Sequence, residues 1–442
     1  MYRTSIAFIF WVLFSTVSAQ TTPPSPGPSR GFVTVVQSAF HDGSGTPLRI
    51  QGINVCNKSK DEGFIGNLGR ADFERIHSWG MNAVRLCIFW EGLEPSPGVF
   101  DDAYLNRIAG LVAEAKAEGL YVLLDMHQDL YSRKFGDGAP LWATLDEGKP
   151  QAQVSDWNDA YYVSPAVQTA LDHFWADSKA PDGMGLQEHY AKVWQHVARR
   201  FKDEPAVLGY DMMNEPFPGK DAGLLEYTML ARVAELLASK PGQPHPSVDE
   251  LLKMEGESAG RKQLTLWLAD IDLYRGMLDA GAPIMQDFDR NRLMPMYERV
   301  RKAIRSEDKK HILFLEAAMS ANLGVETAIA PLRDESGVRD PQQSYSPHVY
   351  DIVVDTDMFA LYGYQRVAMI VDHHRSFAQR NQLPVLVGEW GAFYLDPAAA
   401  PATAEMKQRF AHYGFGDTYW SYSPEMSNWA GLDALKVPAA RR

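Results

Sequence analysis

Val207-Leu-Gly-Tyr-Asp-Met-Met-Asn-Glu-Pro216 is a short apolar run that ends abruptly in an amide, a carboxylate and a proline. A run of this length that stops at a breaker is typical of a buried parallel strand. Asn214 and Glu215 would then lie at the carboxyl end of that strand, where α/β barrels carry their chemistry. Glu215 is therefore the first catalytic candidate.

A second run of the same kind, Leu383-Pro-Val-Leu-Val-Gly-Glu-Trp-Gly391, brings Glu389 to the end of a later strand. Glycoside hydrolysis needs two such carboxyl groups, one to protonate the leaving oxygen and one to attack the sugar carbon. A single Glu at a strand end is more often a surface or ion-paired residue. Because both motifs occur in one chain, we favour the catalytic interpretation for Glu215 and Glu389.

A third carboxylate competes for a catalytic role. Glu316 follows the apolar run Leu313-Phe-Leu315 and would reach the same rim. It lacks the neighbouring amide that Asn214 provides beside Glu215, and such an amide can bind a sugar 2-hydroxyl as the transition state forms. Glu316 is therefore the weaker candidate.

Strand-like runs alternate with helical or irregular stretches along the whole chain. They lie near residues 50–56, 83–89, 120–126, 207–213, 311–316, 344–350, 384–389 and 417–422. Eight runs with long crossovers indicate an α/β fold, a (β/α)8 TIM barrel, in preference to a doubly wound sheet, which would carry a Gly-rich phosphate loop. Ahead of them, the runs 32–36 and 48–50 flank a Gly-rich turn and predict an N-terminal hairpin that could plug the bottom of the barrel.

Helical spacing predicts a helix over 101–118 and two apolar stripes within 166–203, which Pro181-Asp-Gly183 separates. A long helical insertion after the fourth strand is expected between Pro216 and Met285. Its two stripes are Leu225/Met229/Val233/Leu236 and Leu264/Trp267/Leu268/Ile271/Tyr274. These helices could simply pack on the barrel. Because the insertion follows the strand that carries Glu215, exposed apolar side chains there could instead form a wall of the site.

The composition of the chain limits which kinds of molecule it can bind. A net charge of -13 argues against nucleic acid and against an anionic membrane, since both would call for a basic patch. A neutral or weakly charged substrate fits better. We expect a monomer that makes at most transient contact with a membrane or micelle surface.

The first residues have the features of a signal peptide. Residues 1–19 combine an early Arg, an apolar stretch and the small-residue sequence Val17-Ser-Ala19, so we expect cleavage there and secretion. Residues 20–30 are rich in Pro, Ser and Thr and predict a flexible linker. Cys56 and Cys87 fall in two strands that would be neighbours, but spacing alone leaves their pairing open.

Polar residues end several of the other runs. Arg85 lies inside the second run, where an unpaired cation would be costly, and pairing with a rim carboxylate would hold that group ionised. The third run ends in Asp125-Met-His-Gln-Asp129 and brings His127 and Asp129 to the rim. Since no second His follows at ligand spacing, hydrogen bonds to sugar hydroxyls are a better use than a metal. We expect neither a metal nor a cofactor.

Aromatic residues reach the rim from the sixth and eighth runs, which end in Ser346-Pro-His-Val-Tyr350 and Tyr419-Trp-Ser-Tyr-Ser-Pro424. Trp420 could stack on the C–H surface of a sugar, and the Tyr350 hydroxyl could donate to a nucleophilic carboxylate. A buried core role is the alternative for each.

Taken together, these motifs resemble glycoside hydrolase family 5, the cellulase-like retaining clan. The matching residues are Asn214-Glu-Pro216, Gly388-Glu-Trp-Gly391, Arg85, His127, His348-Val-Tyr350 and Trp420. Three longer stretches resemble the endoglycoceramidase-related branch more than the cellulases. They are Asp125-Met-His-Gln-Asp129 with Tyr131-Ser132, Phe135-Gly-Asp-Gly-Ala-Pro140, and Asn54-Val-Cys-Asn-Lys58.

The resemblance implies a retaining β-glycosidase that hydrolyses the bond between glycan and lipid in glycosphingolipids or related glycolipids. Glu215 would be the acid/base and Glu389 the nucleophile. The implied substrate contacts are Lys58, His127, Asp129, Asn214 and Trp420, with support from Arg85, His348 and Tyr350. An endo-β-glucanase and a non-catalytic glycolipid-binding barrel are the alternatives.

Two further expectations follow. Members of the branch usually continue into a C-terminal β-sandwich, whereas this chain ends at Arg442, so residues 31–442 would form the catalytic barrel alone. In that barrel we expect the sugar towards Asp129 and the lipid towards the 217–285 insertion.

Overall fold

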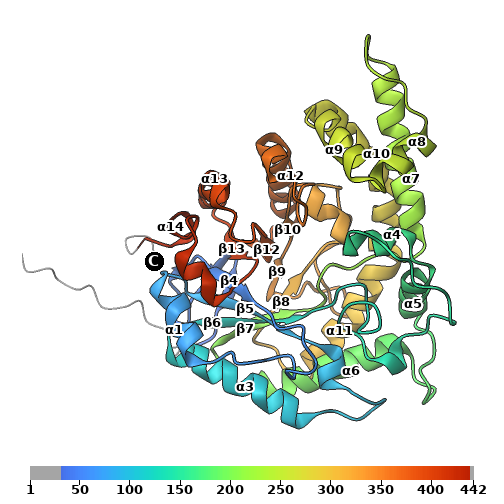
Figure 1. Cartoon of the computed structure of the whole chain (residues 1–442). Helices are drawn as coiled ribbons and strands as arrows, with labels where there is room; N and C mark the ends of the chain where they lie inside the picture. The colour runs from blue at the N-terminus through green and yellow to red at the C-terminus, as the bar shows by residue number, and fades with distance from the viewer. Residues whose placement is uncertain (1–30, 439–442) are drawn as a thin grey trace, which may run out of the picture.

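Parallel strands form a closed ring at the centre of the molecule, and helices surround it (Figure 1). The structure, a computed structural model, describes residues 31–438, so the predicted signal peptide and linker lie outside the described residues. The strands of the ring are β4 (Gln51–Val55), β5 (Ala83–Ile88), β6 (Tyr121–Met126), β7 (Val207–Asp211), β8 (Ile312–Leu315), β9 (Gln343–Tyr345), β11 (Leu386–Val387) and β13 (Gly416–Tyr419). Every residue in them is buried, as expected for strands covered on both faces.

The order of the strands confirms the predicted (β/α)8 barrel. Hydrogen-bonded neighbours run β11-β13-β4-β5-β6-β7-β8-β9. A parallel bridge between Tyr345 and Val385 closes the ring. Beyond it, the short strands β10 (His348–Val349) and β12 (Glu389–Trp390) pair in parallel and extend the sixth and seventh positions towards the carboxyl end.

The opposite end of the ring is covered by the N-terminal segment, as predicted. It contains three antiparallel strands, however: β1 (Thr34–Val36), β2 (Ala39–His41) and β3 (Pro47–Leu48). The sequence did not indicate β2 because the preceding turn, with Gln37 at φ 56°, carries no Gly, Pro or Asn. Phe40 of β2 stacks on Phe314 of β8 and joins the cluster that closes the bottom of the barrel.

The helices confirm the expected pattern with one exception. They are α1 (Arg70–Ser78), α2 (Trp90–Leu93), α3 (Asp102–Ala117), α4 (Ala160–Val163), α5 (Pro165–Trp175), α6 (Leu186–Phe201), α11 (Met294–Glu307), α12 (Tyr364–Asn381), α13 (Ala400–Tyr413) and α14 (Leu432–Leu435). Asp101 caps α3 by accepting a hydrogen bond from the Tyr104 backbone N–H. Between β8 and β9, the chain forms a 3-10 helix over Met319–Leu323 where an α-helix would be usual.

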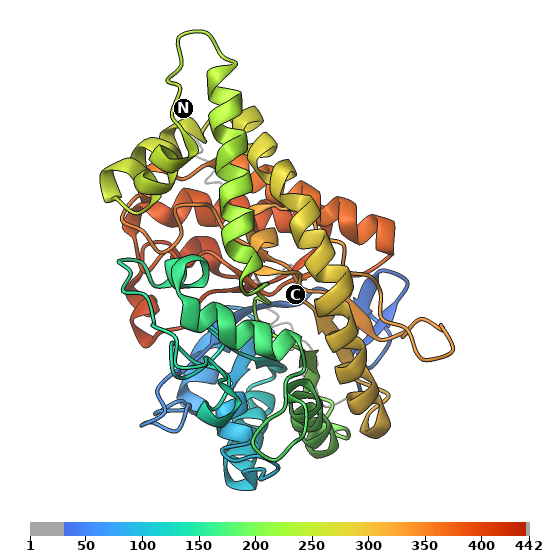
Figure 2. The same cartoon turned by 90° about the vertical axis from the view of Figure 1, so that its right-hand side faces the viewer.

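The insertion is helical, as predicted, and projects beyond the ring (Figures 1 and 2). It consists of α7 (Asp221–Ala238), α8 (Val248–Glu255), α9 (Ser258–Trp267) and α10 (Ile271–Phe288). The second apolar stripe spans two helices, because Asp270 caps α10 and ends the preceding segment. Helices α7 and α10 pack so closely at Gly281 that a Cβ there would lie 2.7 Å from Leu225 Cδ1.

Packing within the insertion changes the expected wall. Leu225, Val233, Leu264, Leu268 and Tyr274 of the predicted stripes are all buried. The exposed apolar side chains are different ones: Leu224 and Tyr227 on α7, and Leu266 on α9. The stripes therefore bind the helices to one another and to the barrel. Within residues 31–438, no helix has both the length and the apolar character needed to cross a bilayer.

Candidate active site

A cavity of about 450 Å³ opens at the carboxyl ends of the strands. The predicted residues in its wall are Lys58, His127, Asp129, Asn214, Glu215, Tyr350, Glu389 and Trp420. Arg85 and His348 do not line it. They lie beneath, fully buried, and contact the two predicted carboxylates from below.

Glu215 and Glu389 face each other across the cavity. Each has a carboxylate oxygen that lies within 4.8 Å of the other's and of a His348 ring nitrogen. His348 Nδ1 lies 2.8 Å from Glu215 Oε1 and 3.5 Å from Glu389 Oε2. The two carboxyl groups that the sequence placed 174 positions apart therefore form one pair.

The surroundings of the two carboxyl groups differ. Burial raises the pKa of Glu215 to about 7, although His348 opposes the shift. Asn322 Nδ2 also donates to Glu215 Oε1 at 2.6 Å. Glu389 accepts two strong hydrogen bonds, from Arg85 Nη1 at 2.6 Å and from the Tyr350 hydroxyl at 2.9 Å. Donors of this kind favour a carboxylate.

The backbone at Glu215 is held in an unusual conformation. Its φ of 43° lies in the left-handed region, which costs about 1–3 kcal/mol for a residue other than glycine. Glu316 Oε2 accepts from the Glu215 backbone N–H at 2.8 Å, and Gln128 Nε2 donates to the Glu215 carbonyl at 3.0 Å. These two contacts fix the direction in which the Glu215 side chain enters the cavity.

Glu316 consequently has a supporting position. Its side chain is buried and does not line the cavity. Besides the Glu215 N–H, it accepts from Arg85 Nη2 at 2.7 Å and lies 3.1 Å from His348 Nε2. With both oxygens engaged below the cavity floor, Glu316 cannot reach a substrate without breaking these contacts.

Arg85 connects the strand ends beneath the cavity. Its guanidinium contacts Asn54, Asp125, Asp211, Asn214, Glu316 and Glu389 at distances of 2.6–3.0 Å. Burial alone would lower the pKa of Arg85, but the surrounding carboxylates raise it well above its usual value. Burial and the neighbouring Glu316 raise the pKa of Asp211 well above its usual value.

One side of the cavity is polar. Lys58 forms a hydrogen-bonded ion pair with Asp129 and lies 3.7 Å from Asp137. Burial would raise the pKa of Asp129, but Lys58 lowers it to about 2, so this carboxylate is charged at neutral pH. The ammonium group of Lys58 also lies 5.1 Å from the centre of the Trp420 ring. We call Lys58, His127, Asp129, Asn214 and Trp420 the sugar half of the cavity, because these residues are the predicted substrate contacts.

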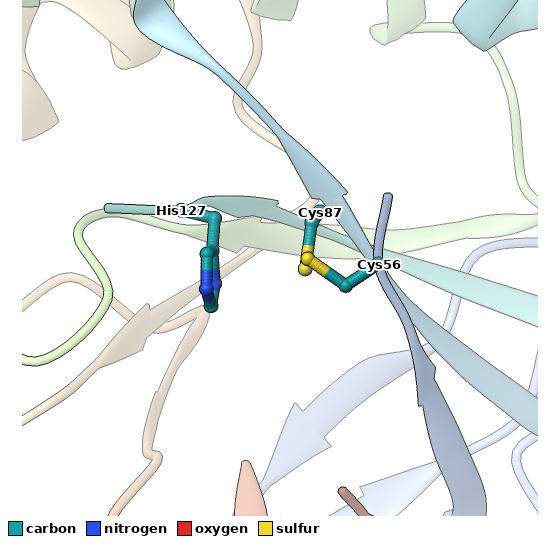
Figure 3. Close-up of side chains that lie close together, drawn as sticks. All are labelled: Cys56, Cys87 and His127. Atoms are coloured by element: carbon teal, nitrogen blue, oxygen red, sulfur yellow. The ribbon is translucent and has the colours of Figure 1, made fainter. Parts of the chain in front are cut away.

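His127 is oriented by a carboxylate below it. Its Nδ1 bonds Asp125 Oδ2 at 2.8 Å, and its ring stacks on Trp420 with centroids 5.3 Å apart. Its Nε2 is buried and has no hydrogen-bond partner in the described part of the chain. Next to it, the side chains of Cys56, which directly follows β4, and of Cys87 on the adjacent strand β5 bring their sulfur atoms close together (Figure 3). Both cysteines are free thiols, and burial raises the pKa of Cys87 well above its usual value.

The other side of the cavity is largely apolar. Its wall contains Trp157, Tyr162, Met319, Leu323, Val354, Asp355, Ala392 and Tyr394, and the polar Asn158, Ser320 and Asn322 on the same segments also line the cavity. We call this set the aglycone half, because it lies apart from the predicted sugar contacts. None of its residues belongs to the 217–285 insertion, so the expectation that the insertion forms this wall is wrong. Arg261 of α9 instead forms ion pairs with Asp156 and Asp159 and so supports the segment that carries Trp157.

Sequence reasoning missed several of these positions. Asn322 and Trp157 lie in short 3-10 helices and Tyr394 lies in a loop, and these segments have no periodic pattern and no neighbouring motif. Asn54 and Asp211 lie within motifs of the sequence that assign them no role of their own. A buried acid at the end of a barrel strand was the only available signal for Asp211.

Comparisons with known proteins agree with this geometry. A family model described as cellulase (glycosyl hydrolase family 5) matches residues 41–426. Endoglycoceramidase I from Rhodococcus hoagii is 31% identical over 199 residues, which are 43% of this chain and 39% of that protein. An endoglycoceramidase from Cyanea nozakii is 27% identical over 304 residues, 62% of this chain and 48% of that protein. These matches thus span less than half the length of either relative.

Solved structures extend the similarity to nearly the whole chain. Endo-glycoceramidase II from Rhodococcus sp., in complex with a cellobiose-like imidazole, superposes with a TM-score of 0.68 at 28% identity, covering 90% of this chain and 80% of that one. The same protein is known as a lactosyl-enzyme intermediate and as a ganglioside GM3 complex, with TM-scores of 0.66 and 0.67 at 26% identity, each covering 91% of this chain and 81% of that one. The barrel, the facing carboxyl groups and the family model together show that this chain belongs to glycosyl hydrolase family 5.

Proposed function

We propose that this protein is a secreted retaining β-glycosidase that hydrolyses the bond between glycan and lipid in glycosphingolipids or related glycolipids. One observation carries the proposal. Glu215 and Glu389 have oxygens within 4.8 Å of each other, between a polar half and an apolar half of one cavity. Carboxyl groups about 5–5.5 Å apart are typical of retaining glycosidases, whereas inverting enzymes need about 6.5–9.5 Å to admit a water.

In the first step, Glu389 would attack the anomeric carbon. The hydrogen bonds from Arg85 and Tyr350 fix its orientation. Glu215 would protonate the leaving oxygen, since a pKa of about 7 leaves a substantial fraction protonated near neutral pH. The C–O bond to the aglycone breaks as the glycosyl–enzyme ester forms.

In the second step, Glu215 would act as a base. Having given up its proton, it takes one from a water that attacks the anomeric carbon and displaces Glu389. The sugar is then released with its original anomeric configuration. The lactosyl-enzyme intermediate of endo-glycoceramidase II supports this two-step mechanism for the present chain by analogy.

The two halves of the cavity support the substrate class. Lys58, Asp129 and Asn214 would bind sugar hydroxyls, and Trp420 would stack on the sugar ring. The apolar wall opposite would contact the lipid, which agrees with the ganglioside bound by the related endo-glycoceramidase II. Secretion is proposed from the signal-peptide pattern of residues 1–19.

The test is a side-by-side assay of glucosylceramide, a longer-chain ganglioside, a steryl glucoside and soluble cellulose. Preferential release of sugar from a glycolipid is expected. Faster hydrolysis of cellulose would favour an endo-β-glucanase, and binding without hydrolysis by folded protein would favour a non-catalytic barrel. NMR of the first-released sugar should show the β-anomer, whereas the α-anomer would contradict retention.

A further inference from the structure

Three loops meet at one carboxylate at the mouth of the cavity. Asp355, in the loop after β10, accepts a hydrogen bond from Trp157 Nε1 at 3.1 Å through Oδ2. Its other oxygen, Oδ1, accepts a hydrogen bond from the Tyr394 hydroxyl. Trp157 follows β6 in the chain and Tyr394 follows β12, yet all three side chains line the aglycone half.

Both aromatic rings are large, exposed surfaces. Trp157 is 41% exposed and Tyr394 is 66% exposed. Scattered exposed aromatic residues are ordinary, but here a single carboxylate ties two of them to the rim of the same cavity. Ring faces held in this way offer apolar contact area with little entropy left to lose on binding.

The protein fixes each partner of Asp355 separately. On one side, Asp156 and Asp159, which flank Trp157, both pair with Arg261 of α9. On the other side, Tyr394 has a φ of 42° and Leu395 a φ of 67°, conformations that cost about 1–3 kcal/mol each. Trp429 Nε1 donates to the Asp396 carbonyl at 2.9 Å and so holds the end of this loop.

The carboxylate of Asp355 can accept further hydrogen bonds. An ionised carboxylate offers about four acceptor positions, and the two aromatic donors occupy only two of them. Within residues 31–438, no Lys, Arg or His side chain forms an ion pair with Asp355. Its oxygens are therefore available to a donor on a bound molecule.

We propose that Asp355 is the specificity-determining residue of the aglycone half and selects aglycones that carry an N–H or O–H donor close to the glycosidic oxygen. This inference rests on the proposed function and narrows its substrate class. A ceramide has such donors, an amide N–H and a hydroxyl, next to its alkyl chains, and a steryl aglycone has none. Trp157 and Tyr394 hold the apolar part while Asp355 accepts the donor hydrogen.

The test compares Asp355→Ala with wild type on glucosylceramide, a steryl glucoside and an aryl β-glucoside. Losing a hydrogen bond to a charged group weakens binding by about tenfold or more, so kcat/KM for glucosylceramide should fall by at least about tenfold. The loss should appear mainly in KM. For the two substrates without a donor, the fall should be less than about threefold. Equal losses on all three substrates, or no loss on glucosylceramide, would overturn the proposal.

Two further variants keep the test decisive. Tyr394→Phe removes a single donor to Asp355 and keeps the ring, so it should lower kcat/KM for glucosylceramide less than Asp355→Ala does. Asp357→Ala changes an exposed acid in the same loop and should leave all three rates unaltered. If wild-type protein hydrolyses none of the substrates, the proposed function fails. If it hydrolyses them and the ratios do not shift in Asp355→Ala, the assignment of Asp355 alone fails.

Discussion

The sugar half and the aglycone half of the cavity are built on different principles. Residues of the sugar half stand at or just beyond strand ends and are tied into ion pairs beneath them, as Lys58 is to Asp129. Residues of the aglycone half stand on long loops that are tied to one another, as Trp157 and Tyr394 are by Asp355. In a barrel, the strands hold the charged side chains of the site in place, and the loops determine the shape of the cavity wall. The two halves should therefore respond differently to substitution.

Glu389→Gln removes a group that both halves share and should have the largest effect. Without a nucleophile no glycosyl–enzyme ester forms, and kcat should fall by about 10⁴-fold or more on every substrate. Steady-state assays on glucosylceramide and an aryl glucoside would measure it. A thermal-unfolding scan serves as the control for folding, since Arg85 loses a charged partner. A loss confined to one substrate would contradict a shared nucleophile.

Glu215→Gln should come next and depend on the leaving group. General-acid catalysis contributes about 10²–10⁴-fold, so kcat/KM should fall by that factor for a lipid glycoside. A dinitrophenyl glycoside needs no protonation and should lose far less in kcat/KM.

The pH dependence of the wild type follows from the same group. The acid must be protonated, so above a pKa of about 7 kcat/KM for the lipid glycoside should fall tenfold per pH unit. The activated aryl glycoside should lack this basic limb. The same basic limb for both substrates would exclude Glu215 as the acid.

Lys58→Met tests the sugar half alone. It removes a cation that contacts Asp129 and Asp137, so the pKa of Asp129 should rise and sugar hydroxyls should lose a charged partner. We expect kcat/KM to fall about 10–100-fold, and by the same factor for glucosylceramide and an aryl glucoside that carries the same sugar. A selective loss on the lipid substrate would show that the two halves are not separate.

Leu266→Lys should have the smallest effect. Leu266 is 48% exposed on α9 and lies outside the cavity wall, so it can act only on substrate presented in a micelle or vesicle. KM for glycosylceramide in micelles should rise a few-fold at most, with no change for a soluble aryl glycoside. Val338→Lys, at a 61% exposed apolar residue between β8 and β9, is the matched control. If both variants had equal effects, the insertion surface would have no specific role in binding substrate presented in a micelle or vesicle.

The sequence predicted the residues at strand ends better than the residues on loops. Glu215, Glu389 and Arg85 could be assigned because each stands in or at the end of a buried apolar run, and strand ends meet at one rim. Asn322 and Asp355 could not be assigned from the sequence, because short 3-10 helices and loops carry no periodic pattern. The contacts of these two residues also join segments that are far apart in the chain. The insertion was predicted as helical from its spacing. Its apolar stripes were assigned to the wrong surface, because spacing does not reveal which neighbour a helix face packs against.

Arg85 links the formation of the active site to the completion of the barrel. Its contacts reach from Asn54 on β4 to Glu389 on β12, so the first and seventh positions of the ring must both be in place before its set of contacts is complete. A partly folded intermediate that lacks the later strands would keep the ion pairs of Arg85 with Asp125 and Asp211 but lose the one with Glu389, and would be less stable. The hydrolytic centre and the last stage of folding are thus coupled. Hydrogen exchange in β5 should accordingly report the closing of the entire ring.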